Sequence, residues 1–122
     1  MHFGEVLDED RYQDCIRVAY EAGIRTFVTA DVYGQGKADA ALGEVLSEYP
    51  RESYCLVGML GHDFIDGERE GSKGYPRFTS PSLRGESGYR DFLRRACESS
   101  LTNCQTSHFD LVMLHNPDEI GY

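Results

Sequence analysis

The spacing of apolar residues changes repeatedly along the chain, and this alternation limits the folds that the chain can adopt. Apolar residues recur every three or four positions in three segments, 8–22, 38–49 and 89–104. Short, mostly apolar runs follow them at 24–30, 53–58 and 109–115. The first pattern is typical of a helix with one buried face, and the second of a buried strand. Buried strands that alternate with helices predict an α/β fold with a parallel sheet.

Residues that favour helix ends lie at the boundaries of these segments. Asp8 is a suitable N-cap for the first helix, Gly23 is a suitable stop for it, and Pro50 ends the second helix. Residues 59–85 form one long connection rich in glycine, proline and charge, whereas most strand-to-helix connections are short. Such a connection is either functional or disordered, and we expect its acidic run at 62–68 to be solvated.

Composition and charge exclude several classes of partner. The formal net charge is −9 and there is no basic stripe or tail, so nucleic acid is not an expected partner. No apolar run approaches the roughly 18 residues that span a bilayer, and the N-terminus lacks the features of a signal peptide. The sequence predicts a cytoplasmic protein that does not bind membranes.

The four cysteines are expected to be buried, free thiols. They are Cys15, Cys55, Cys97 and Cys104, and no two of them form a CxxC pair. Each falls on the apolar face of a predicted helix or inside a predicted strand, where a thiol packs as a small apolar group. We therefore expect neither a disulfide bond nor a zinc site from them.

Three polar residues stand at, or just beyond, the C-terminal ends of the predicted strands: Tyr33, His62 and His115. The loops at this end of a parallel sheet converge, and active sites are built there. We expect Tyr33 and His115 to belong to such a site. A loop histidine is ordinarily solvated, so His62 is an auxiliary candidate. The spacing within 62–68 matches no ligand pattern for a hard cation, and we predict no metal site.

Two motifs carry a resemblance to a known family. The run AGIRTFVTADVYGQG at 22–36, followed by ALGEVL at 41–46, resembles the aldo-keto reductase pattern A-G-[IV]-x-x-[FI]-D-T-A-x-x-Y-G-x-G and its following helix. The run FDLVMLHNPD at 109–118 resembles the later signature D-L-x-x-[LI]-H-x-P-[DE] of that family. The resemblance implies that 1–122 is the N-terminal portion of a (β/α)8 TIM barrel. This portion is incomplete at both ends, with Met1 to Gly4 standing for the opening strand.

The resemblance also implies roles for individual residues. In that family a tyrosine donates a proton to the substrate carbonyl, a histidine orients the carbonyl, and a lysine paired with an aspartate lowers the pKa of the tyrosine. Tyr33 and His115 match the tyrosine and the histidine. The aspartate position holds Val28 and the lysine position holds Met59, so the catalytic tetrad is degenerate. We expect the two partners to be lost together, because a buried lysine without its carboxylate would lower the free energy of unfolding by several kcal/mol.

A tyrosine without a neighbouring cation is a weak general acid near neutral pH. Asp31, His62 and Lys73 are the candidates to replace the lost pair, although none of them occupies the position of either lost residue in the family pattern. A histidinium at His62 could stabilise a phenolate much as lysine does.

The resemblance implies an oxidoreductase whose full-length relatives reduce a carbonyl compound with NADP(H) or NAD(H). A complete barrel needs about 200–250 residues and binds phosphate after its last two strands. We therefore expect the 122-residue chain alone to be inactive and to bind no cofactor. Two alternatives remain: a non-catalytic binding module, and a lyase or isomerase that uses Tyr33, His62 and His115 for proton transfer. The final strand should be an exposed edge that favours self-association.

Overall fold

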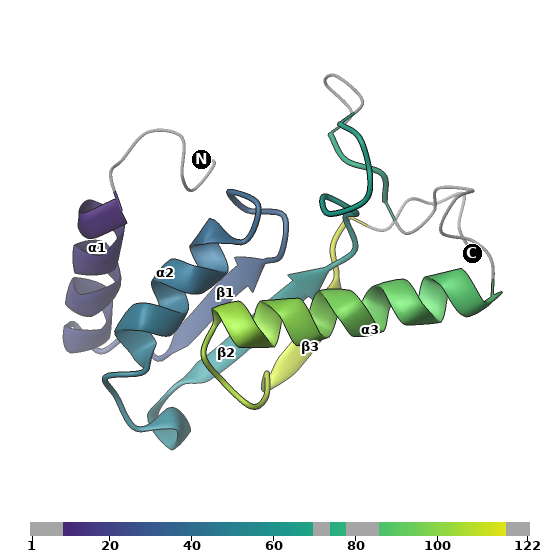
Figure 1. The fold of residues 1–122 in the computed structure, drawn as a ribbon. Helices are drawn as coiled ribbons and strands as arrows, with labels where there is room; N and C mark the ends of the chain where they lie inside the picture. Colours follow the sequence, from purple (N-terminus) through teal and green to yellow (C-terminus); the bar gives the residue numbers. More distant parts are fainter. Residues whose placement is uncertain (1–8, 70–73, 78–85, 117–122) are drawn as a thin grey trace.

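The computed structural model describes residues 9–69, 74–77 and 86–116 (Figure 1). Its helices are α1 (Glu9–Glu21), α2 (Lys37–Leu46) and α3 (Glu86–Asn103), and its strands are β1 (Thr26–Ala30), β2 (Cys55–Leu60) and β3 (Leu111–Leu114). A short 3-10 helix, η1 (Arg51–Ser53), precedes β2. The predicted alternation of helices and strands is therefore confirmed. The expected opening strand and the Asp8 cap lie outside the described residues.

The three strands form one parallel sheet in the order β1-β2-β3. Ala30 pairs with Met59, and Leu60 pairs with Leu114, so the strands end close to one level. Strands that follow one another in sequence and in space, joined by helices, are the repeating unit of a (β/α)8 barrel. The sheet is a partial barrel in which β3 forms one edge of the described part.

The helices and the sheet bury one main core. Helix α2 packs on β1, α3 packs on β2, and α1 packs along α2 (Figure 1). The central core is apolar and consists of Ile16, Phe27, Ala41, Leu42, Val45, Leu46, Tyr54, Leu56 and Cys104. The opposite face of the sheet is open: Val28 and Leu111 each keep 51% of their surface exposed. Along β3 all four residues are exposed, so this strand lacks a covering helix among the described residues.

Several expected boundaries and burials are wrong in detail. Strand β2 continues through Leu60, so the long connection begins after that residue and not at position 59. Helix α2 ends at Leu46, and Tyr49 lies in the following turn, where its ring stacks on Tyr20 at 3.7 Å between centroids. Tyr49 thus fits the apolar spacing of the helix because its ring packs on Tyr20, although its backbone lies beyond the end of α2.

The prediction of buried thiols holds only in part. Cys104 is buried, Cys55 and Cys97 are partly buried, and Cys15 is exposed; all four are free. The buried positions of α1 are Tyr12 and Ile16, because this helix is covered only along the side that meets α2. Cys15 lies on the solvent side of that narrow contact.

A buried carboxylate links the sheet to two helices. Asp39 on α2 is fully buried and accepts a hydrogen bond from Thr29 Oγ1 of β1 at 2.5 Å. It also accepts one from Ser100 Oγ of α3. Burial raises the pKa of Asp39, and the two hydroxyl donors partly offset this effect. The two donors satisfy a group that would otherwise be costly to bury.

Removing one of these donors should destabilise the fold. We expect Ser100→Ala to lower the free energy of unfolding by about 1.5–3 kcal/mol, the usual contribution of a hydrogen bond to a charged group. Thr102→Ala, an exposed change on the same helix, should alter it by less than about 0.5 kcal/mol. Urea unfolding of the two variants measures the difference. Equal losses would show that the contact with Asp39 contributes nothing.

A second carboxylate joins the start of β3 to β2. Asp110 Oδ2 accepts hydrogen bonds from the backbone N–H of Leu56 at 2.8 Å and from Arg51 Nη2 at 2.7 Å. Arg51 also donates to the backbone carbonyls of Tyr54 and His108. The backbone N–H of Leu56 and the Arg51 guanidinium hold the pKa of Asp110 below its usual value.

This lowered pKa predicts a pH-dependent contribution to stability. A carboxyl group whose folded pKa lies below its unfolded value, about 3.9, stabilises the fold above that pH and loses the effect as pH falls through the folded pKa. Asp110→Asn should therefore reduce the free energy of unfolding near neutral pH, and the difference from the wild type should shrink below about pH 4. Thermal melts across this range measure it. A difference that does not change with pH would contradict the assignment.

Candidate active site at the strand ends

Polar residues from three neighbouring strands lie together at the carboxyl end of the sheet. Asp31 directly follows β1, His62 comes shortly after β2, and His115 directly follows β3. The Asp31 N–H donates to the Met59 carbonyl at 3.1 Å, and the His115 N–H donates to the Leu60 carbonyl at 2.7 Å. The backbone hydrogen bonds of the sheet thus extend to Asp31 and His115 and fix the positions of their Cα atoms.

Aromatic contacts bring the predicted site residues together. The rings of Tyr33 and His115 pack edge to face, with 5.4 Å between centroids and an interplanar angle of 90°. The His62 ring also packs against the His115 ring, with 4.6 Å between centroids. The expected clustering of Tyr33, His62 and His115 is therefore present, while their catalytic roles stay predictions.

The site is well shielded from solvent. Asp31 is 3% exposed, His62 7% and His115 9%, and Tyr33 is partly buried. The expectation that His62 is a solvated loop residue is wrong. A ring held in this way has lost most of its contact with water, so its environment is that of an interior group.

The loop after β2 folds back and causes this burial. His62 forms an isolated antiparallel bridge with Arg77, and the Asp63 N–H donates to the Pro76 carbonyl at 2.8 Å. Asp63 is also buried. The start of the acidic run is therefore interior and not solvated, whereas Ile65, Asp66 and Glu68 are exposed as expected. Nothing in the local sequence marks this return of the chain, because it depends on contacts with residues beyond the run.

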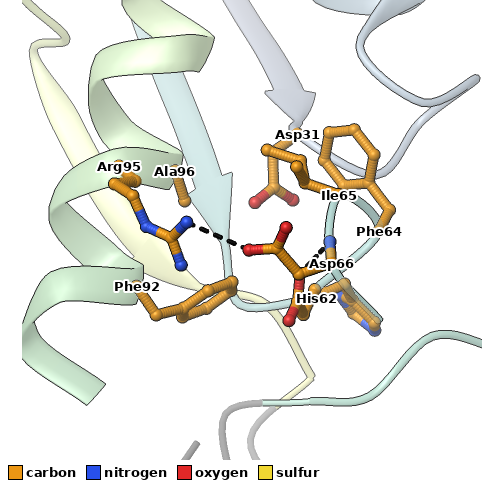
Figure 2. Close-up of a pocket in the computed structure, with 9 residues that line it drawn as sticks. Asp31, His62, Phe64, Ile65, Asp66, Phe92, Arg95 and Ala96 are labelled. Carbon is orange, nitrogen blue, oxygen red and sulfur yellow. Dashed lines mark hydrogen bonds and ion pairs between the residues drawn. The ribbon is translucent and has the colours of Figure 1, made fainter. Parts of the chain in front are cut away.

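A small pocket opens beside this cluster, between the loop and α3 (Figure 2). Figure 2 shows the Asp31 carboxylate pointing into it. An ion pair of 3.0 Å between Arg95 and Asp66 ties the loop to α3, and the Asp66 N–H donates to Asp63 Oδ1 at 3.0 Å. The pocket walls are Asp31, His62, Asp63, Phe64, Ile65, Asp66, Phe92, Arg95 and Ala96. The loop thus forms one wall of a space that the strand ends leave open.

Burial changes the acid–base properties of this cluster. Loss of solvation raises the pKa of Asp31 to about 7, although the nearby backbone N–H groups of Gly61 and Val32 act in the opposite direction. Neither oxygen of the Asp31 carboxylate accepts a hydrogen bond of ordinary geometry, and His115 Nδ1 has none either. Burial lowers the pKa of His115, and the positive charge of Arg77 adds to this effect. At neutral pH His115 is therefore a neutral imidazole.

Comparison with known proteins settles the family. The family model described as Aldo/keto reductase family matches residues 1–122. The chain belongs to the aldo/keto reductase family. The resemblance found in the sequence motifs and the partial-barrel fold are both confirmed.

The curated relatives that the chain matches are about three times its length. The chain is 30% identical to versiconal hemiacetal acetate reductase of Aspergillus parasiticus, over 94% of this chain and 34% of that protein. It is 27% identical to probable aldo-keto reductase 1 of Glycine max, over 95% of this chain and 30% of that protein. The chain therefore spans about a third of the length of the curated relatives that it matches.

Solved structures show the same relation. An aldo-keto reductase from Bacillus halodurans, in its holo form, matches with a TM-score of 0.70 and 27% identity, over 88% of this chain and 32% of that chain. Another, from Klebsiella pneumoniae and in complex with NADPH, matches with a TM-score of 0.63 and 22% identity, over 91% of this chain and 31% of that chain. The segment thus has the geometry of one part of a larger reductase barrel.

The two positions that the family resemblance identifies as vacated lie on one face of the sheet. Val28 pairs with Val57, and Ala30 pairs with Met59, so Val28 and Met59 are diagonal neighbours on adjacent strands. This face is the open one: Val28 is 51% exposed and Met59 is partly buried. Lys73, the third candidate replacement, lies outside the described residues.

Restoring an ion pair at these positions tests the assignment. In the chain as described, Val28→Asp and Met59→Lys together should show a favourable coupling energy of about 0.2–1 kcal/mol, as for exposed ion pairs. Because Val28 is half exposed, a single aspartate at this position should lower the free energy of unfolding only slightly. If the rest of a barrel covered this face, the same change would cost several kcal/mol. Urea unfolding of the two single variants and the double variant measures the coupling. Additive effects would show that the two positions do not meet.

Proposed function

We propose that the full-length protein is a carbonyl reductase that uses NADPH or NADH, with Tyr33 as proton donor and His115 orienting the substrate oxygen. The observation that carries this proposal is the edge-to-face contact of Tyr33 and His115, with 5.4 Å between centroids, at the strand ends of a barrel of this family. Both residues also occupy the matching positions of the two family motifs. A carbonyl oxygen that reached both groups would meet a hydroxyl donor and an imidazole together.

The nicotinamide would supply the hydride, and the residues of this chain would manage the proton. Tyr33 would donate to the carbonyl oxygen, and the neutral His115 would hold that oxygen through a hydrogen bond from its ring. Asp31 and His62 are auxiliary residues in this scheme: they are buried, belong to the same cluster and stand in for the missing aspartate–lysine pair. Burial raises the pKa of Asp31 to about 7, so this group can exchange a proton near neutral pH.

The cofactor proposal rests on the relatives and not on the described residues. A structure of a family member from Klebsiella pneumoniae contains NADPH. In such barrels the phosphate site follows the last strands, and the part described contains three strands. We therefore expect no cofactor binding and no turnover from the 122-residue segment alone.

The expected setting is the cytoplasm, with a small carbonyl compound as the partner. All four cysteines are free thiols, which is typical of a reducing compartment. Among the described helices none is long and apolar enough to cross a membrane. Self-association through the edge of β3 stays a prediction, supported by its four exposed residues.

The test is reduction of an aromatic aldehyde such as 4-nitrobenzaldehyde by the full-length protein, followed as NADPH oxidation. Tyr33→Phe should lower kcat by at least about 100-fold, the lower range for loss of a general acid. Tyr49→Phe removes a hydroxyl from a ring that stacks on Tyr20, away from the site, and should leave kcat unchanged. A wild type that oxidises neither NADPH nor NADH with a carbonyl compound would contradict the proposal. So would a Tyr33→Phe variant as active as Tyr49→Phe.

A second candidate function is favoured by the contact between His62 and His115. Two adjacent imidazoles and a phenol can move protons without hydride, as a lyase or isomerase requires. Exchange of deuterium from solvent into the carbon next to a carbonyl, without any nicotinamide, would identify this activity. His62→Gln should abolish that exchange. If neither reaction occurs, the non-catalytic binding module is the remaining alternative.

A further inference from the structure

We propose that Asp31, His62 and His115 form a binding site for a divalent transition-metal ion, with Zn²⁺ as the best-matched ion. Each residue offers one ligand atom, and these atoms all lie within 4.8 Å of one another. Among the residues that the structure describes, they form the one group of three or more histidine, cysteine or acidic side chains that meets this condition. The proposal does not rest on the reductase function, and an ion bound here would use the same three side chains that the reductase proposal assigns to the substrate oxygen and to proton transfer.

Backbone contacts hold the three ligands at the carboxyl end of the sheet. Asp31 and His115 directly follow paired strands, and their backbone N–H groups bond to β2 at 3.1 Å and 2.7 Å. His62 is held by its bridge to Arg77. A ligand set carried by three adjacent strand ends has little freedom to spread apart. Tetrahedral Zn²⁺ holds its ligand atoms about 3.4 Å apart, so atoms that lie within 4.8 Å of one another would have to approach by only a short distance.

The burial of Asp31 indicates that something is needed to satisfy it. Asp31 is 3% exposed, yet neither oxygen accepts a hydrogen bond of ordinary geometry. The contrast with Asp39 is informative, because that equally buried carboxylate receives hydroxyl donors from Thr29 and Ser100. Apart from the backbone N–H groups of Gly61 and Val32, no such donor reaches Asp31, and its burial favours the protonated form. A cation that replaced this proton would compensate the buried carboxylate. His115 Nδ1, which is buried and also lacks an acceptor or donor partner, belongs to the same cluster.

The donor set selects the class of ion. Two imidazoles and one carboxylate suit Zn²⁺ and Fe²⁺, whereas Mg²⁺ and Ca²⁺ prefer oxygen ligands alone. Three protein ligands leave at least one position for water or a substrate oxygen, as in catalytic zinc sites. The neutral form of His115 is the form that binds metals. Arg77, whose charge reaches His115, opposes the cation in part, and the Asp31 carboxylate offsets it.

The experiment is titration of the full-length protein, stripped with EDTA, with Zn²⁺ in a calorimeter and with Co²⁺ in a spectrophotometer. We expect one ion per chain and visible Co²⁺ bands. Loss of a group that only orients a metal ligand weakens metal binding by about 10–100-fold. We expect a larger loss of affinity from each of the three ligand variants, Asp31→Asn, His62→Ala and His115→Ala. The matched control is His108→Ala, because His108 is exposed and its ring is hydrogen-bonded to the neighbouring Ser107. This control should bind as tightly as the wild type.

Two results of the binding measurements would overturn the proposal. One is a wild type that binds neither ion at micromolar concentration, and the other is full binding by the His62 and His115 variants. X-ray absorption of the Zn²⁺-loaded wild type tests the ligands directly, so the result does not depend on whether the variants fold. Scattering from two imidazoles is expected, and a shell of thiolates or of oxygen alone would also overturn the site. None of these readouts uses NADPH, so failure of the reductase proposal would leave them unaffected.

Discussion

The hydrogen-bonded register of the three parallel strands is the constraint on which the rest of the structure depends. Ala30 opposite Met59 and Leu60 opposite Leu114 bring three strand ends to one level. The strand pairing alone therefore makes neighbours of residues that are far apart in sequence. A slip of one residue in β3 would move the His115 side chain to the other face of the sheet and separate it from Tyr33 and His62.

Two buried aspartates near this level have different environments. Asp39 is enclosed by hydroxyl donors from β1 and α3 and so acts as a fixed link between the layers. Asp31 lies at the mouth of the sheet, with a raised pKa of about 7 and without equivalent donors. The same side chain thus serves packing in one place and remains available for chemistry in the other. Burial alone does not distinguish the two, whereas the supply of donors does.

The sequence predicts those parts of the fold that depend on local periodicity. Alternating helical and strand patterns gave the order of elements, and the ends of three apolar runs located Tyr33, His62 and His115. Exact strand ends were less predictable. The second strand is predicted to end at Gly58, but this residue lies inside β2, where a Cβ atom would come within 2.9 Å of the Phe109 ring. The glycine is needed for that close approach and not for a turn.

Features set by distant contacts could not be predicted from local patterns. Cys15 fits a helical apolar stripe, yet α1 is covered along one narrow side only, and the thiol stays exposed. His62 reads as a loop residue because its burial depends on the return of the chain at Arg77. The raised pKa of Asp31 likewise depends on the packing around it. In each case the environment of the side chain is set by residues too far away in the sequence for a local pattern to include them.

The distribution of burial has a consequence for the order in which parts of the fold can form. Asp31, His62 and His115 are shielded although the face of the sheet around Val28 and Leu111 is open. His115 follows β3, so it can reach Tyr33 and His62 only after β3 has paired with β2. That step completes the polar cluster but does not cover the apolar side chains around Val28. The open apolar face, and not the polar cluster, is therefore the part of the described structure that is available to other chains.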